Sequence, residues 1–207
     1  FTMPSYTLHY FDARGHGEVS RMLFNLAGVE FTDHRVSRDN KEWSEMKPNT
    51  PFGCLPLLEV DGKFIPQSFA IARYLAKEFG FAGKTPFESS WVDALGDQYK
   101  DYTNEITPFF FAMTTPEKDK VQKEVAEPAR DKFFAILEKK LKDNGSGYIV
   151  GPSVTWIDIV IADHVEALEK WIPGFFDTFP KVLVHRDTVY AIPQIKSWIE
   201  KRHPNPY

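Results

Sequence analysis

The chain has 207 residues, of which 43% are hydrophobic, 26% charged and 15% aromatic, and this composition is typical of a folded globular protein rather than a disordered one. Its 25 basic and 29 acidic residues give a formal charge of −4, so it lacks the basic surplus typical of nucleic-acid-binding proteins. The single cysteine, Cys54, excludes an internal disulfide and favours a reducing, cytoplasmic environment. No apolar run approaches the ~18 residues of a membrane-spanning helix, so we expect neither nucleic acid nor a membrane as a partner.

The N-terminal residues predict a parallel strand-helix-strand unit. Residues 6–11 and 31–36 are rich in residues that favour strands, and residues 18–27 between them have apolar positions at helical spacing. Gly28 follows this stretch and is suited to ending the helix. Two strands joined by one helix of this length favour a right-handed crossover with parallel strands.

The next segment predicts an antiparallel hairpin and a helix. Residues 57–60 and 63–66 flank Asp61-Gly62, a dipeptide that tolerates positive φ and indicates a two-residue hairpin turn. Ser68 then precedes an apolar stripe at helical spacing that continues to residue 79. We expect this serine to cap the start of that helix.

A cluster of glycine and proline at residues 80–86 separates this mixed sheet from a segment with no strand pattern. Within that segment Thr155 and Asp158 have the spacing of a capping box before a very apolar helix. The other predicted helices cover residues 87–113, 121–141, 181–190 and 193–201. The sequence therefore predicts an α/β domain over residues 3–79, a linker over 80–86 and an all-helical domain over 87–207.

Two neighbouring features offer recognition chemistry. Pro56 at a strand entry leaves the Leu55 backbone free to pair with an extended peptide, and the Ser68 hydroxyl with the adjacent helix-start amides attracts a carboxylate. The same residues also suit a proline that begins an edge strand and a serine that caps a helix, and both alternatives stay open. The six histidines lack metal-ligand spacing, so we expect no metal site.

Short motifs occur in a specific order over nearly the whole chain: Tyr10-Phe11, Arg14-Gly15, Trp43 with Lys47, Pro51-Phe52-Gly53, Leu55-Pro56, Asp61-Gly62, Gln67-Ser68, Ala72-Arg73-Tyr74-Leu75, Thr155-Trp156-Ile157-Asp158 and Ala191-Ile192-Pro193. Together they resemble a cytosolic glutathione S-transferase of the tyrosine-type, sigma-like branch, similar to the enzymes of nematodes. The resemblance implies a thioredoxin-like first domain with the order βαβαββα, an all-α second domain, a cytoplasmic homodimer, and glutathione as co-substrate with no other cofactor.

The resemblance assigns the catalytic role to Tyr10, with electrostatic support from Arg14. A free thiol has a pKa of ~8.5, so little of it is thiolate at neutral pH. A charge-assisted hydrogen bond from a phenol of ~1.5 to 3 kcal/mol corresponds to roughly one to two pKa units. Such a bond makes the thiolate the dominant form.

Glutathione contacts follow from the same resemblance. The backbone of Leu55, before a cis Pro56, would pair with the cysteinyl unit, and Gln67 and Ser68 would hold the γ-glutamyl carboxylate.

At the other end of the tripeptide, Trp43 and Lys47 would reach the cysteinyl-glycine, with Lys47 as a counter-ion for its carboxylate. Asp101 matches an acid that approaches the glutathione ammonium from the second subunit, although the nearby Asp97 is an alternative for this role. Cys54 is a candidate for a mixed disulfide with glutathione under oxidation, and an inert thiol is the alternative.

The electrophile pocket is expected to be apolar, with candidate residues Phe11, Ala13, His16, Phe109, Phe110 and Met113; helix core is the alternative for the last three. We expect an enzyme that conjugates glutathione to hydrophobic electrophiles in detoxification. A glutathione-dependent prostaglandin D isomerase is an alternative, although His16 replaces an arginine of some sigma-like relatives. A non-catalytic ligandin that binds haem or other hydrophobic ligands is another.

Overall fold

The computed structural model describes residues 4–37 and 41–202, so the predicted domain limits at residues 3 and 207 lie outside the described residues. The first domain has the predicted order βαβαββα. Its elements are β1 (Tyr6–Phe11), α1 (Glu18–Ala27), β2 (Thr32–Val36), α2 (Glu42–Met46), β3 (Leu57–Val60), β4 (Lys63–Pro66) and α3 (Ser68–Phe79), with short 3₁₀ turns at Gly15–Gly17 and Lys47–Asn49.

The four strands form one mixed sheet in the order β2-β1-β3-β4. β1 pairs with β2 in parallel, whereas β1 with β3 and β3 with β4 are antiparallel, which confirms the predicted crossover and hairpin. Alternate β1 side chains Tyr6, Leu8 and Tyr10 are buried, as expected for a strand with one face on a core. Tyr6 packs against Phe24 of α1 and Phe79 of α3, so these two helices cover that face.

Local signals confirm most element ends in this domain. Gly28 has a left-handed conformation at the end of α1, and both Asp61 and Gly62 have positive φ in the hairpin turn. The prediction that Ser68 caps α3 is wrong, because Ser68 is already helical and Gln67 holds the cap position with φ of 75°. A side chain in this region of φ is strained by about 1–3 kcal/mol, so the surrounding fold must hold Gln67 there.

The second domain is helical throughout the described residues. Its elements are α4 (Pro86–Ala112), α5 (Lys118–Val121), a π-helical turn (Gln122–Ala126), α6 (Glu127–Asn144), α7 (Trp156–Trp171), α8 (Pro180–Tyr190) and α9 (Pro193–Lys201). The capping box at the start of α7 is confirmed, since the Thr155 amide donates to the Asp158 carboxylate at 2.7 Å. The helix predicted over 121–141 is divided instead, because Pro128 in the first turn of α6 has no amide to continue the preceding helix.

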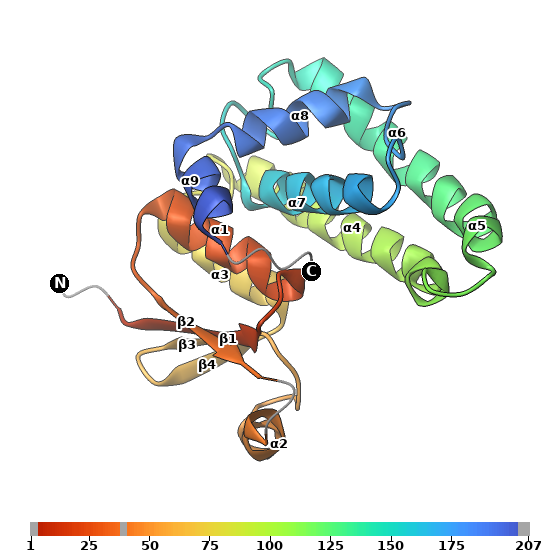
Figure 1. Cartoon of the computed structure of the whole chain (residues 1–207). Coiled ribbons are helices and arrows are strands. Elements are labelled where there is room, and N and C mark those ends of the chain that lie inside the picture. Colours follow the sequence, from red (N-terminus) through yellow and green to blue (C-terminus); the bar gives the residue numbers. More distant parts are fainter. Residues whose placement is uncertain (1–3, 38–40, 203–207) are drawn as a thin grey trace.

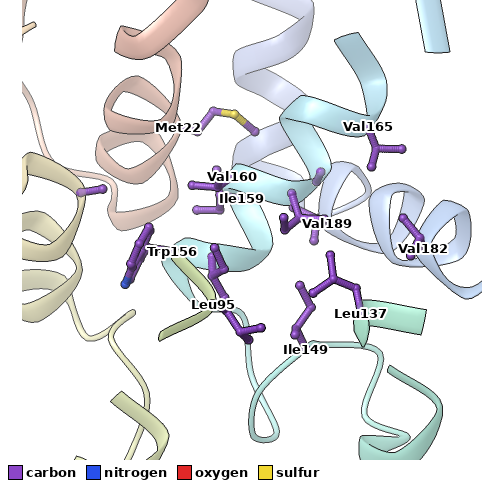
Figure 2. Packing of buried hydrophobic residues seen from close by; sticks show 14 of the residues in the cluster. Met22, Leu95, Leu137, Ile149, Trp156, Ile159, Val160, Val165, Val182 and Val189 are labelled. Carbon is purple, nitrogen blue, oxygen red and sulfur yellow. The ribbon is translucent and has the colours of Figure 1, made fainter. Parts of the chain in front are cut away.

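The two domains pack through α1 and α3, which lie between the sheet and the helical domain (Figure 1). α2 lies on the opposite side of the sheet from that domain (Figure 1). α7 is the central helix of the second domain, and Figure 2 shows Met22 of α1 on one side of it and Val182 and Val189 of α8 on the other. Within residues 4–37 and 41–202, no helix has the length and apolar character needed to cross a bilayer.

Candidate functional site

A cavity of about 730 Å³ lies between the two domains. Its walls come from the turn after β1, the segment before β3, the start of α3, and the facing sides of α4 and α7. Seven residues predicted from the sequence to form the glutathione or electrophile site meet there: Arg14, His16, Leu55, Pro56, Gln67, Ser68 and Phe110. The cavity also includes Cys54 and Arg73.

The segment before β3 has the geometry needed to receive an extended peptide. The Leu55-Pro56 bond is cis, and the paired register of the sheet begins only at Leu57. The Leu55 backbone therefore lies at the cavity outside the strand ladder. An extended ligand can pair there as an added strand would.

The start of α3 provides an anion-binding end next to that segment. Gln67, Ser68, Phe69 and Ala70 line the cavity, and the first turn of the helix contains no acidic side chain. The first amides of a helix have no partner within it and carry partial positive charge. A carboxylate held at this end would be stabilised by these amides and by the Ser68 hydroxyl.

The Tyr10 hydroxyl lies next to Gly15 and His16, two residues that line the cavity. The backbone N–H of His16 donates a hydrogen bond to the Tyr10 oxygen at 3.1 Å, and a Cβ built on Gly15 would lie 2.7 Å from that oxygen. Tyr10 is only 6% exposed and does not itself line the cavity. Because its oxygen accepts from His16, the hydroxyl proton stays available to donate, and an accepted bond strengthens such donation.

Gly17 is required for this arrangement. A Cβ at this position would lie 2.6 Å from Cδ1 of Tyr10, closer than side-chain packing allows. The turn that covers Tyr10 can therefore approach the ring only with glycine at this position.

Arg14 joins the cavity to the helical domain. Its Nη2 donates to Asp163 at 2.5 Å and to Glu166 at 2.8 Å, both on α7. Burial alone would lower the pKa of the Arg14 guanidinium, but the two carboxylates raise it overall. Burial raises the pKa of Asp163, although Arg14 opposes this effect. The guanidinium is thus fixed as a cation at the domain interface.

The residues predicted for the glycine end of glutathione lie beside the cavity rather than in its lining. Trp43 on α2 packs against the Phe11 ring at 5.6 Å between centroids. Lys47 is exposed, and its Cε would lie 3.7 Å from a Cβ on Gly53, next to Cys54 at the rim.

The two α4 residues predicted as candidates for the ammonium contact, Asp97 and Asp101, have different surroundings. Asp101 is exposed and does not line the cavity of its own chain. Asp97 accepts a hydrogen bond from Arg73 at 2.5 Å, and Arg73 does line it. Both acids therefore stay candidates for the ammonium contact.

The electrophile candidates require a correction. Phe109 is 1% exposed and belongs to the hydrophobic core, because it faces the interior of the helical domain. Phe11, Ala13 and Met113 also do not line the cavity, whereas His16 and Phe110 do.

The sequence reasoning missed most of the wall formed by the two helices: Tyr99, Thr103 and Thr107 of α4, and Val160, Asp163, His164, Ala167 and Trp171 of α7. These residues recur every three to four positions, so the sequence did indicate that they share one face of each helix. The sequence did not indicate that these two faces meet, because the two helices are far apart in the chain. Among the described residues, no group of three or more His, Cys, Asp or Glu side chains could hold a metal ion.

Comparison with known proteins gives consistent matches along the chain. Residues 6–77 match the family model described as the glutathione S-transferase N-terminal domain, and residues 100–202 match the one described as the C-terminal domain. Glutathione S-transferase 1 of Ascaris suum is 49% identical and the alignment covers 99% of this chain and 100% of that protein.

Solved structures are also similar. A glutathione S-transferase of the hookworm Necator americanus, described as monomeric, matches with a TM-score of 0.94 and 47% identity over 98% of this chain and 100% of that chain. A structure described as prostaglandin synthase D of Nilaparvata lugens matches with a TM-score of 0.86 and 33% identity over 97% of this chain and 99% of that chain.

Proposed function

The chain belongs to the glutathione S-transferase family, and on this premise we propose that it activates the thiol of glutathione through Tyr10 and transfers the sulfur to apolar electrophiles. In this reaction the thiol proton leaves for solvent, and the thiolate forms a carbon–sulfur bond as the electrophile's leaving group departs. Glutathione is a co-substrate in this proposal, and no metal takes part.

The observation that carries the proposal is the state of the Tyr10 hydroxyl. Its oxygen accepts from the His16 amide at 3.1 Å, so its proton is directed to another acceptor. A thiolate is a charged acceptor, and a hydrogen bond to it is worth about 1.5–3 kcal/mol. The neutral thiol gains less, and this difference lowers the thiol pKa.

The cavity supports a specific position for the tripeptide. The cysteinyl unit would pair with the Leu55 backbone before cis Pro56, and the γ-glutamyl carboxylate would bind Gln67, Ser68 and the amides at the start of α3. Trp43 and Lys47 would then reach the glycine end.

The remaining cavity wall supports an apolar electrophile. Phe110 of α4 and Val160, Leu168 and Trp171 of α7 lie along it. Burial of such surface favours apolar ligands by about 25 cal/mol per Å². A prostaglandin isomerase is a second candidate because of the similarity to the Nilaparvata lugens structure; analysis of the product formed from a prostaglandin endoperoxide distinguishes the two activities.

We also propose a cytoplasmic homodimer in which Asp101 acts in the site of the partner. The support for a dimer is the exposure of two large apolar side chains, Phe52 at 65% and Phe87 on α4 at 74%, since contact with a partner would remove them from water. The similar structure from Necator americanus is described as monomeric, so a monomer is the alternative to the proposed dimer. The molecular mass of the protein in solution decides between dimer and monomer.

The test of the catalytic role is Tyr10→Phe, which removes one oxygen and keeps the ring. The expected result is a fall in kcat of roughly tenfold to a hundredfold, from a lost hydrogen bond of ~1.5 to 3 kcal/mol, with glutathione affinity changed only a few fold. The pKa of the bound thiol, followed by its ultraviolet absorbance, should rise toward that of free glutathione. A large loss of affinity with unchanged kcat and unchanged thiol pKa would contradict the assignment.

A further inference from the structure

Two histidines lie against each other on the face of the sheet that points away from the helical domain. His9 of β1 and His34 of β2 are partners in the parallel register, and their Nδ1 atoms lie 2.7 Å apart. The rings meet edge to face, with 5.0 Å between their centroids. His9 is 9% exposed, whereas the His34 side chain is 39% exposed. The distance between the two nitrogens is that of a hydrogen bond between the rings.

Each ring also contacts a carboxylate. Nε2 of His9 lies 3.2 Å from Oε2 of Glu59 on β3, and Nε2 of His34 lies 2.8 Å from Oε1 of Glu42 on α2. The other Glu42 oxygen accepts from the backbone N–H of Ser37 at 3.1 Å. Three contacts therefore run in series from β3 through both histidines to the first turn of α2.

The number of protons in this series follows from its geometry. A carboxylate can only accept, so Nε2 of each histidine must carry a proton. The contact between the rings needs one more proton, on one of the two Nδ1 atoms. Two neutral imidazoles supply two protons, whereas the three contacts need three. The pair thus forms all of its hydrogen bonds only when it carries a single positive charge.

The surroundings place this charge on His34. Burial lowers the pKa of His9, the hydrogen bond with Glu59 opposes this, and a charge on His34 lowers it further. His9 therefore stays neutral and accepts at Nδ1. His34 then donates through both nitrogens, to His9 and to Glu42.

The other elements around the pair add no competing charge in contact with it. Phe64 of β4 contributes an uncharged ring, with 6.1 Å between its centroid and that of His9. Asp33 and Arg35 flank His34 along β2, so their side chains lie on the other face of the sheet, where they pair with each other at 2.9 Å. The charged groups in contact with the two rings are therefore the carboxylates of β3 and α2.

The position of α2 depends on such polar contacts. None of the five residues of this helix is buried, so burial of apolar surface contributes little to holding it. Trp43, next to Glu42, packs against the Phe11 ring, which lies on the same face of β1 as His9. Figure 1 shows α2 on this side of the sheet. The hydrogen bond from His34 to Glu42 therefore helps to fix where Trp43 lies.

We propose that His34, protonated on both nitrogens and supported by His9, is a positioning residue that holds α2 at the glycine end of glutathione. This inference rests on the proposed function, which assigns that end of the tripeptide to Trp43 and Lys47. Neither histidine contacts the ligand. As the pH rises the third proton is lost, and the bond to Glu42 is no longer charge-assisted and becomes roughly half as strong. The affinity for glutathione should then decrease.

The binding test uses S-methylglutathione, which has no thiol to titrate, and isothermal titration calorimetry of the full-length protein at pH 6 and pH 8. These values lie on either side of ~6.5, where an isolated imidazole loses its charge. His34→Phe keeps a ring on the sheet but removes both nitrogens. At pH 6 it should weaken the affinity by roughly tenfold, as the loss of one charge-assisted hydrogen bond does. At pH 8 the loss should be smaller by at least about threefold.

The comparison of the two proteins isolates the histidine pair. The ammonium group of the ligand titrates in both experiments alike, so its contribution cancels in the ratio of their affinities. Phe64→Leu is the matched control, because it alters packing beside His9 but removes no nitrogen and no carboxylate. It should keep the dependence on pH of the unmodified protein.

An equal loss of affinity at both pH values in the His34→Phe protein, or no loss at either, would overturn the inference and leave the proposed function intact. If the unmodified protein does not bind S-methylglutathione at either pH, the proposed function is contradicted, and this inference with it.

A second measurement needs no variant and no ligand. In ¹⁵N-labelled protein at pH 6, nuclear magnetic resonance should show a proton on Nε2 of both His9 and His34, and one proton between their Nδ1 atoms with scalar coupling across that hydrogen bond. An unprotonated Nε2 on either ring would mean that the pair is neutral, and it would overturn the inference. A proton on both Nδ1 atoms would overturn it as well, because the two rings would then repel each other.

Discussion

The burial of His164 makes the free energy of unfolding depend on pH. Burial lowers the pKa of this imidazole to about 3, against 6.5 for the ordinary side chain. The unfolded chain therefore binds the proton more tightly than the native protein at every pH between these values. The free energy of unfolding is highest above pH 6.5 and falls as the pH decreases toward about 3.

The size of the effect follows from that difference in pKa. Each pH unit below 6.5 costs about 1.36 kcal/mol. Lowering the pH from 7 to 5 should thus remove about 2 kcal/mol through this one group. This is a substantial part of the ~5 to 15 kcal/mol that stabilises a typical domain.

The assay is urea denaturation at both pH values and at one protein concentration, because the stability of an oligomer depends on concentration. The variant is His164→Gln, which keeps polar atoms but does not titrate. Tyr102→Phe is the matched control, since it removes a hydroxyl partner of His164 but leaves the imidazole in place.

Between pH 7 and pH 5, the unmodified protein and Tyr102→Phe should each lose about 2 kcal/mol more than His164→Gln does. The other acidic and basic groups are common to all three proteins, so their contributions cancel in this comparison. If His164→Gln shows the same dependence on pH as the unmodified protein, the reasoning about the buried imidazole is refuted.

Two further changes test the domain interface and the oligomer. Arg14→Gln removes the guanidinium that pairs with Asp163 and Glu166, whereas Lys170 still pairs with Glu166 and Arg202 stays 3.8 Å from Asp163. We therefore expect a loss of about 1.5–3 kcal/mol in urea denaturation, part of which a second change of Asp163 to Asn restores; a loss below ~1 kcal/mol would speak against this ion pair. Phe52→Ala removes a 65% exposed ring and should raise the dimer dissociation constant in analytical ultracentrifugation by roughly tenfold or more, since burial of such a side chain contributes ~1.5 to 3 kcal/mol. An unmodified chain that sediments as a monomer would rule out this role for Phe52.

Some features of the fold depend on residues close together in the chain, and the sequence predicted these well. The Asp61-Gly62 turn needs two adjacent residues that tolerate positive φ, and the capping box needs only Thr155 and Asp158. The prediction was wrong where two neighbouring residues could each begin a helix. Ser68 has a side chain suited to a helix cap, but Gln67 holds the cap position of α3.

The segments proposed to bind glutathione could also be predicted, because Leu55-Pro56 and Gln67-Ser68 come from one continuous part of the chain and match the motifs of a known family. The structure brings both pairs to one cavity with the predicted Arg14 and His16. For Phe109 the sequence left the cleft and the helix core as alternatives, and the structure places it in the core, because helical spacing cannot tell a position that faces the cleft from one that faces the core.

The sequence alone determined the order of the elements, the division into two domains and the family resemblance, because each depends on periodicity or on motifs within a short span. Only the tertiary structure decided which faces of α4 and α7 meet. Tyr99 and His164 are 65 residues apart, and their hydrogen bond exists only because two separately formed helices pack together. The lowered pKa of His164 follows from its burial, and burial is a property of the whole fold that no local pattern specifies.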